Sequence, residues 1–262
     1  MAVITCRSKS LPTASLARAA RRAVEVNPAN AIAHRVVTRT PTGRVGGRKR
    51  IAVVKGLRWP ATGVRLTVQF LDGPGRDLRT RILLHMNAWG THANVQFVET
   101  RATGKVRIAR LDSPEEMAGY WSYLGTELLD APPDEPTMNL EGFTMKESEA
   151  KFRRVVRHEA GHTLGFEHEH MRNALVQRID RRKAFAFFDK DQGWTREEVE
   201  EQVLTPLEAR TLMGTRTSDP LSIMCYQLPG SIMKDGRSIR GGRDINATDH
   251  AFAAALYPKR LK

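Results

Sequence analysis

A run of thirteen residues, HEAGHTLGFEHEH from His158 to His170, holds four of the eight histidines in this 262-residue chain. His158 and His162 are four residues apart, so on a helix their imidazoles lie one above the other on the same face. Two neutral imidazoles placed this way can reach one metal ion. Glu159 follows the first of them, where its carboxylate can act on water instead of binding the metal. The run therefore predicts a helix that carries a metal site.

Gly165 predicts a sharp turn at the end of that helix. Glycine adopts positive φ easily, so it can end a helix abruptly and turn the chain back. Such a turn can return His168 to the ion held by His158 and His162. Three neutral histidines leave the fourth position of a tetrahedral Zn²⁺ open, as in catalytic zinc sites. We therefore expect these three histidines to bind Zn²⁺ and Glu159 to be catalytic.

The spacing of apolar residues elsewhere predicts a mixture of helices and strands. Val64, Leu66, Val68 and Phe70 alternate with polar residues, as in a half-buried strand, and a Gly-Pro-Gly turn comes after them. Helices are expected over 13–26, 76–89, 146–164, 195–204 and 247–256, and further strands over 94–100, 105–111 and 137–143.

Positive charge is concentrated near the N-terminus. Residues 1–60 contain thirteen Lys and Arg and one acid, Glu25, and so carry +12 of the net charge of +13. The stretch TRTPTGRVGGRKR at 38–50 is rich in Gly, Pro and Arg, which is typical of a linker or an exposed loop. The sequence therefore predicts a basic N-terminal extension over 1–50, a candidate prosegment, and a folded domain over 51–262.

Composition excludes several classes of protein. No apolar run approaches the roughly 18 residues that a membrane-spanning helix needs. The first residues lack the apolar block of a Sec signal peptide, so we expect a cytoplasmic location as the chain stands, with export by another route left open. Cys6 and Cys225 are the only cysteines and cannot form a disulfide framework.

The histidine run resembles the metzincin zinc peptidases, in which the motif HExxHxxGxxH is followed by a methionine turn. SIMCY, Ser222 to Tyr226, matches that turn and lies about 55 residues after the histidines. By this resemblance, Met224 forms the hydrophobic floor beneath the three imidazoles. The resemblance implies a zinc-dependent metalloendopeptidase that hydrolyses peptide or protein substrates through a zinc-activated water and Glu159 as general base.

Within the metzincins the sequence is most similar to the astacin family. GFEHEHMR at 165–172 is similar to the family signature GFxHExxR, and Tyr226 matches a tyrosine that stabilises the oxyanion of the transition state. Shorter matches are RWP at 58–60, WSYLG at 121–125 and ALYP at 255–258. The resemblance covers about 51–262 and is strongest at the histidines.

The same resemblance implies an α+β, zincin-like fold. We expect a mixed sheet and two long helices in an upper subdomain, and an irregular lower subdomain after Gly165 that ends in a C-terminal helix. The cleft lies between the two. The strand over 137–143 is implied to form the cleft edge and to pair with an extended peptide substrate.

The sequence also departs from the family pattern. It lacks the four cysteines of secreted astacins, and residues 1–57 contain no Asp to inhibit the zinc. A Cys6 thiolate is one alternative inhibitor, because soft sulfur binds zinc well. Glu169 matches a residue that pairs with a freshly cut N-terminus, which cleavage after Arg50 would create at Ile51. A salt bridge between Glu169 and an arginine is the other interpretation.

A second function class remains open at this stage. The basic extension can attract nucleic acid or another anionic surface, with the zinc site in a structural role. No aromatic residues are interleaved for base stacking and no nucleic-acid module is evident, so the sequence favours the peptidase.

Overall fold

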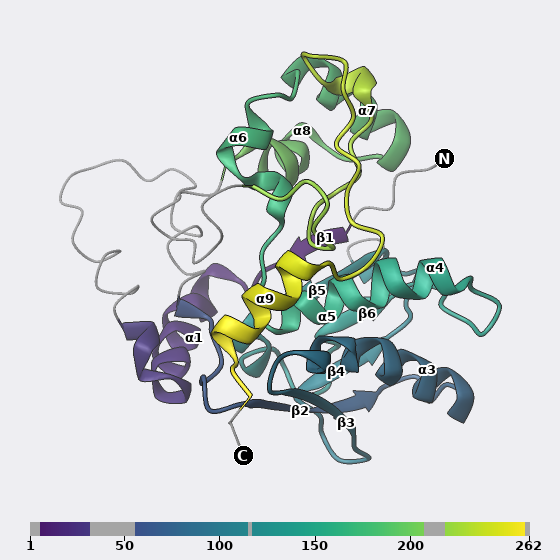
Figure 1. The fold of residues 1–262 in the computed structure, drawn as a ribbon. Helices are drawn as coiled ribbons and strands as arrows, with labels where there is room; N and C mark the ends of the chain where they lie inside the picture. Colours follow the sequence, from purple (N-terminus) through teal and green to yellow (C-terminus); the bar gives the residue numbers. More distant parts are fainter. Residues whose placement is uncertain (1–5, 32–55, 115–116, 207–217, 260–262) are drawn as a thin grey trace.

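A six-stranded mixed sheet forms the base of the protein, whose computed structural model describes residues 6–31, 56–114, 117–206 and 218–259 (Figure 1). The strands have the order β1-β5-β6-β4-β2-β3, and all neighbours are parallel except β5 and β6. The strands are β1 Cys6–Lys9, β2 Val64–Phe70, β3 Val95–Glu99, β4 Val106–Ala109, β5 Tyr120–Tyr123 and β6 Met138–Leu140. The expected alternation in β2 is confirmed, since Val64, Leu66 and Val68 are buried.

Helices cover one face of this sheet. The long helical segment that carries the first histidines runs through α4, η6 and α5, and its middle is a π-helix. It begins at Glu149 with Ser148 as N-cap, slightly inside the predicted range of 146–164. The helices here are α3 Arg76–Met86, η3 Asn87–Thr91, α4 Glu149–Lys151, η6 Phe152–Val156, α5 Arg157–Thr163 and α9 Ala247–Leu256.

The chain beyond Gly165 forms a second group of short elements. They are η7 Glu169–Met171, α6 Asn173–Val176, α7 Arg181–Gln192, α8 Arg196–Val199, η8 Glu200–Leu204 and η9 Gly230–Ile232. Apart from two isolated β-bridges, no strand occurs among the described residues of this part, 166–206 and 218–246. The predicted helix over 195–204 therefore corresponds to α8 and the π-helical η8 after it.

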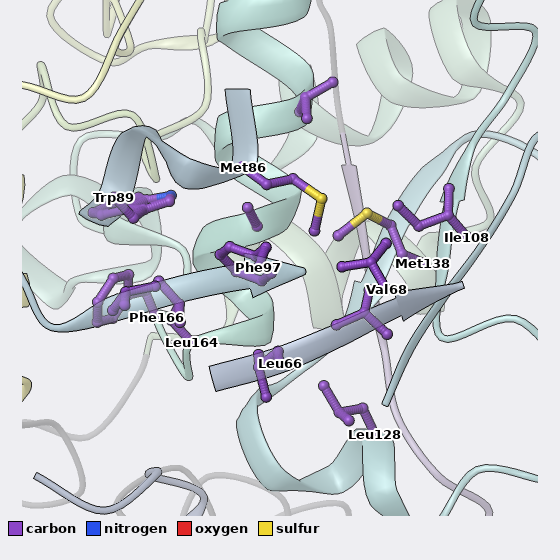
Figure 2. Packing of buried hydrophobic residues seen from close by; sticks show 14 of the residues in the cluster. Leu66, Val68, Met86, Trp89, Phe97, Ile108, Leu128, Met138, Leu164 and Phe166 are labelled. Atoms are coloured by element: carbon purple, nitrogen blue, oxygen red, sulfur yellow. The ribbon is translucent and has the colours of Figure 1, made fainter. Parts of the chain in front are cut away.

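Two hydrophobic clusters match these two groups of elements. The larger cluster lies between the sheet and its helices and includes Leu66, Phe97 and Met138 from the strands together with Trp89 and Phe166 (Figure 2). The second cluster joins the short helices after Gly165 and includes Phe188, Trp194 and Val203. The α+β class and the irregular region after Gly165 that the sequence implied are thus confirmed, and the C-terminal helix α9 packs in the larger cluster through Ala253.

The prediction that residues 137–143 form the cleft-edge strand is wrong. Residues 137–143 contain β6, which is not an edge strand, because β4 pairs with it on one side and β5 on the other. The sequence interpretation overlooked β5, Tyr120–Tyr123, which adds antiparallel to β6. The outer side of β5 is in turn covered by β1 in parallel pairing.

The described part of the N-terminal extension packs on the domain. After β1, helix α1 Thr13–Val26 lies against η5 Gly125–Leu129, and η1 Pro28–Asn30 comes next. Arg18 Nε donates to Asp130 Oδ1 at 3.0 Å, and Arg22 Nη1 donates to the carbonyl of Leu129 at 2.8 Å. The linker over 38–50 lies outside the described residues. No helix among the residues described is long and apolar enough to cross a membrane.

Candidate metal centre

Three histidine side chains converge where α5 ends. His158 and His162 are one turn apart on α5, and Gly165 has φ of +92°, which turns the chain back so that His168 returns toward them. The Nε2 atoms of His158 and His162 are 3.2 Å apart, and that of His168 lies 3.2 Å from the first and 3.1 Å from the second. The three predicted ligands are therefore brought together with the same ring nitrogen facing inward.

Hydrogen bonds fix the tautomers of two of these rings. His158 Nδ1 lies 2.7 Å from the carbonyl oxygen of Ile223, and His162 Nδ1 lies 2.7 Å from that of Phe166. A carbonyl only accepts, so each Nδ1 carries the proton and each Nε2 keeps a lone pair. Burial lowers the pKa of His162 to about 4 and the pKa of His158 well below its usual value. Neutral rings with inward lone pairs are the form that binds metal.

The spacing of these nitrogens fits a tetrahedral zinc ion. Zinc–nitrogen bonds of about 2.0–2.1 Å at tetrahedral angles place two nitrogens about 3.3 Å apart. The distances of 3.1 and 3.2 Å are close to this value. Without a cation, three inward lone pairs at this separation would repel one another, so the arrangement is the one expected of a cation site.

Cys6 completes the set of donors. Its Sγ lies 3.3 Å from Nε2 of His162 and 3.4 Å from Nε2 of His168, and all four donor atoms lie within 4.8 Å of one another. Strand β1 places it there, with Cys6 in register with Tyr120 of β5. Burial, and to a lesser extent the nearby Glu159, raises the pKa of the thiol well above its usual value. A bound cation favours the thiolate instead.

Glu159 lies buried beside this cluster. Neither of its carboxylate oxygens has a hydrogen-bond partner of good geometry among the residues described. Burial raises its pKa to about 8, while the Cys6 thiol and the Arg154 guanidinium act in the opposite direction. The carboxylate of Glu159 is therefore buried next to the donor atoms, with the Cys6 thiol as a neighbour.

Met224 packs directly beneath the histidine helix. A Cβ added to Gly161 would lie 2.5 Å from Met224 Sδ, so only glycine lets the two elements approach this closely. Arg154, one turn before His158, donates to the carbonyls of Ile223 at 2.5 Å and Cys225 at 3.0 Å. The sequence interpretation missed both Arg154 and Gly161. The only signal for them is their position in the helix, four residues before His158 and one before His162 respectively.

Tyr226 reaches the same centre from the methionine turn. Its hydroxyl donates to the backbone carbonyl of Cys6, and its ring stacks on His170 with centroids 3.9 Å apart and planes at 16°. The His168 ring is 4.5 Å from it, edge to face. Tyr226 is therefore next to the candidate ligands but held by the N-terminal extension.

Glu169 makes contacts of another kind. Its Oε1 accepts a hydrogen bond from the Asp219 backbone N–H at 2.9 Å and lies 3.9 Å from Arg172 Nε. Burial raises the pKa of this carboxyl. An arginine partner is thus present, whereas Ile51, the partner expected after cleavage, lies outside the described residues.

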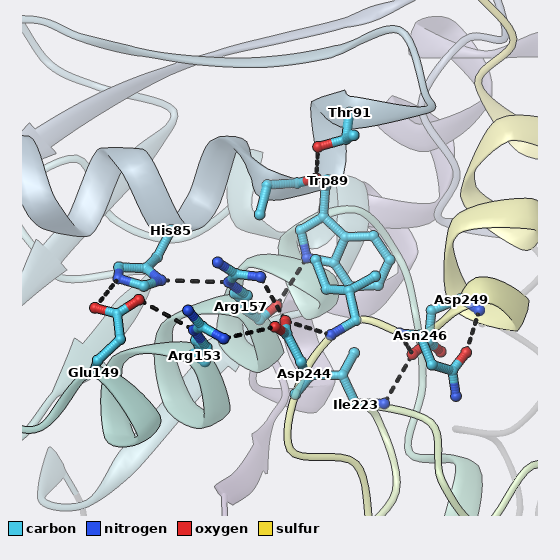
Figure 3. Close-up of polar contacts among 12 residues, drawn as sticks. His85, Trp89, Thr91, Glu149, Arg153, Arg157, Ile223, Asp244, Asn246 and Asp249 are labelled. Atoms are coloured by element: carbon cyan, nitrogen blue, oxygen red, sulfur yellow. Dashed lines mark hydrogen bonds and ion pairs between the residues drawn. The ribbon is translucent and has the colours of Figure 1, made fainter.

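Polar contacts hold the histidine helix against its neighbours (Figure 3). Glu149 pairs with Arg153 and His85, and Asp244 pairs with Arg153 and Arg157.

Two further hydrogen bonds hold the end of α5. Trp59 Nε1 donates to the carbonyl of Thr163 at 2.8 Å, and the Tyr257 hydroxyl donates to that of Leu164 at 2.6 Å. Trp59 and Tyr257 belong to the short RWP and ALYP matches.

Asp249 anchors the methionine turn from α9. Its carboxylate accepts from Ser222 Oγ at 2.6 Å and from the backbone N–H of Ile223 at 2.9 Å. It also accepts from the N–H of Asn246 in a capping box at the start of α9 (Figure 3). The methionine turn is therefore fixed to the C-terminal helix.

Comparisons with known proteins find similar folds among solved structures. Neither a protein-family model nor a curated protein matches the chain. A solved structure of myroilysin matches 79% of this chain and 98% of its own at 29% identity, with a TM-score of 0.73. A second myroilysin structure covers 78% of this chain and 86% of its own at 28% identity, with a TM-score of 0.59.

A more distant match shares the fold alone. It is high choriolytic enzyme 1, a hatching-enzyme zinc protease from the medaka fish Oryzias latipes. The alignment covers 78% of this chain and 94% of that one at 17% identity, with a TM-score of 0.52.

Proposed function

We propose that this chain, which is a metzincin zinc metalloendopeptidase of the astacin type, cuts its substrates with Glu159 as general base and Tyr226 as oxyanion-stabilising group. The observation that carries the proposal is the triangle of Nε2 atoms of His158, His162 and His168, 3.1 to 3.2 Å apart, beside a buried carboxylate. These three histidines would hold the zinc. Gly165, Met224 and Glu169 would support the site from the turn and the floor.

Each catalytic role rests on position and chemistry. The chemistry supplied by bound zinc is Lewis acidity, which polarises a scissile carbonyl and makes a water molecule more acidic. Glu159 takes a proton from the attacking water and passes it to the leaving amine, a role suited to a carboxyl group with a raised pKa. Tyr226 donates a hydrogen bond from its hydroxyl to the oxyanion as negative charge develops there.

The sheet provides the binding site that we propose for the substrate. The outer side of β5 is the edge at which an extended peptide would add as a further strand. Peptides and proteins are therefore the substrate class, and main-chain hydrogen bonds to residues 120–123 would align them across the metal.

We further propose that residues 1–50 are an inhibitory prosegment of the domain at 51–262. Support comes from Cys6 Sγ, which lies 3.3 and 3.4 Å from the Nε2 atoms of His162 and His168, where water or substrate would have to bind. The Cys6 carbonyl also accepts the hydroxyl of Tyr226. The same segment would therefore block the fourth metal position, cover the sheet edge at β5 and engage the hydroxyl of Tyr226. Binding of nucleic acid by the basic residues of the extension stays a prediction.

The experiment uses the full chain with Cys6→Ala, so that the fourth metal position is open. Zinc content is measured by elemental analysis, and cleavage of an unstructured protein is followed with and without a chelator. Adding Glu159→Gln is expected to lower the cleavage rate at least about a hundredfold, the usual worth of a general base, and to leave zinc bound.

The matched control is Glu197→Gln, which makes the same charge change at an exposed residue of α8. The control should cut at the parental rate. Cleavage by the Glu159→Gln variant at the parental rate, or protein that binds no stoichiometric zinc, would refute the proposal.

A further inference from the structure

The residue after Cys6 contacts a pair of side chains from the second subdomain. The Arg7 guanidinium lies 5.9 Å from the centre of the Trp194 ring, and its Nη1 is 4.0 Å from Glu198 Oε1. Cys6 faces the three histidines, so Arg7 lies one residue from the metal centre. Figure 1 shows β1 at the junction between the sheet and α6, α7 and α8.

We propose that Trp194 and Glu198 form a substrate subsite for a positively charged side chain, which Arg7 fills while the extension is in place. The inference rests on the proposed peptidase function and names its substrate class. These are peptides with Arg or Lys within two residues of the scissile bond. An aromatic face next to a carboxylate is a general way of binding a guanidinium or an ammonium group.

The Glu198 carboxylate is held in place by its own helix. Its Oε2 accepts from the Thr195 N–H at 2.8 Å and from the Thr195 hydroxyl at 3.1 Å, which completes a capping box at the start of α8. The other oxygen, Oε1, is the one that faces Arg7. The carboxylate is therefore held by hydrogen bonds from its own helix, which limits the conformational entropy lost when a cation binds.

Trp194 is fixed as well. Its ring stacks on Phe188 with centroids 5.1 Å apart and planes at 13°, and it belongs to the core of the second subdomain. Gly193, with φ of +65°, makes the left-handed turn that separates α7 from α8 and presents the ring. The two side chains of the subsite thus lie four residues apart, Trp194 just before α8 and Glu198 within it.

A second cationic side chain of the extension repeats the pattern. Lys9, two residues after Arg7, has its Nζ 5.0 Å from the centre of the Trp121 ring. Residues i and i+2 of a strand lie on the same face and are about 6.6 Å apart. A bound peptide that pairs with β5 as β1 does would present alternate side chains to Trp194 and Trp121. The sheet edge thus suits an extended cationic peptide.

The chain itself contains a sequence of this class. Arg48, Lys49 and Arg50 are consecutive in the linker between the extension and the domain. Cleavage beside them would remove the prosegment, so a preference for basic residues would also make one copy of the protein a substrate for another.

The test measures sequence preference in the full chain with Cys6→Ala and Arg7→Ala, in which neither the metal position nor the subsite is filled by a side chain of the extension. Quenched-fluorescent peptides vary one position at a time among Arg, Lys, norleucine and Glu, on both sides of the scissile bond. Cut sites are read by mass spectrometry. At one position, Arg and Lys are expected to be favoured over norleucine by roughly tenfold in kcat/KM, as for a half-exposed ion pair with a cation–π contact.

The decisive variant is Glu198→Gln, added to the same background. Gln keeps a carbonyl oxygen for the capping box but loses the charge. The preference for Arg over norleucine, measured within one enzyme, should fall to roughly threefold or less, and Glu198→Lys should favour the Glu peptide instead. Glu197→Gln on the same helix is the matched control and should keep the full preference.

Two results would overturn the subsite. One is a parent that cuts Arg and norleucine peptides equally well at every position, and the other is a Glu198→Gln variant with the parental preference. Both results require active enzyme, and so they differ from failure of the proposed function, in which no peptide is cut in a zinc-dependent way.

Discussion

Replacement of Gly161 by Ala tests the packing of the histidine helix on its floor. The added Cβ would lie 2.5 Å from Met224 Sδ and 3.1 Å from Trp89 Cζ2, both in a buried environment. Overpacking of this kind costs typically about 1–3 kcal/mol. Ala is favoured over Gly inside a helix by about 1 kcal/mol, which offsets part of the cost. We expect Gly161→Ala to destabilise the folded protein by about 1 kcal/mol net.

A double-mutant cycle isolates the contact. Met224→Ala alone should cost about 2–5 kcal/mol, because it leaves a cavity. In the double variant the methyl group added at position 161 enters that cavity, so the two changes together should cost less than the sum of the single changes by at least about 1 kcal/mol. Free energies of unfolding come from urea titration of the zinc-loaded full chain.

Zinc affinity gives the second readout of the same cycle. A displaced Met224 no longer supports the three imidazoles, so Gly161→Ala should also weaken zinc binding, measured by competition with a chromophoric chelator. Additive free energies, or a Gly161→Ala variant that is more stable by the full helix propensity, would refute the reasoning about this contact.

Four further predictions concern the extension and the metal. Cys6→Ala should raise peptide hydrolysis by the full chain at least roughly tenfold, because it opens the fourth metal position; unchanged hydrolysis would argue against inhibition by the thiol. Asp130→Asn should loosen α1, because the buried carboxylate that pairs with Arg18 at 3.0 Å loses its charge; we expect a loss of about 1–3 kcal/mol and faster proteolysis of the extension. Arg154→Met should lower kcat more than it raises KM and should alter the visible spectrum of the cobalt-substituted enzyme, whereas Arg154→Lys should restore part of both. Removal of zinc should lower Tm, since an ion present at about a thousand times its Kd stabilises the fold by about 4 kcal/mol; equal melting curves with and without chelator would contradict the centre.

The histidine cluster was predictable because its geometry is local. A spacing of four residues on a helix and a glycine after it place His158, His162 and His168 within reach of one ion, with no need to know the rest of the fold. Helix periodicity likewise predicted α1 and α9 at their observed bounds.

The sheet edge was not predictable in the same way. β1 and β5 are four residues each, and their pairing joins segments more than a hundred residues apart. Nothing in CRSK or YWSY reveals its partner, and the family resemblance implied that the substrate-pairing strand lies at 137–143, which is interior. Gly161 and Arg154 were not predictable for a related reason. Both contact the methionine turn, and the sequence does not show that this turn packs against the helix.

The parallel pairing of β1 with β5 has a consequence for the behaviour of the released domain. Unpaired strand edges are templates for association with other chains. While the extension is attached, the outer N–H and C=O groups of residues 120–123 are satisfied within one molecule. Excision would expose them, and a concentrated preparation of the excised form should then self-associate more readily than its precursor. If residues 1–50 act as the proposed prosegment, the covered edge would limit association between copies until the extension is removed.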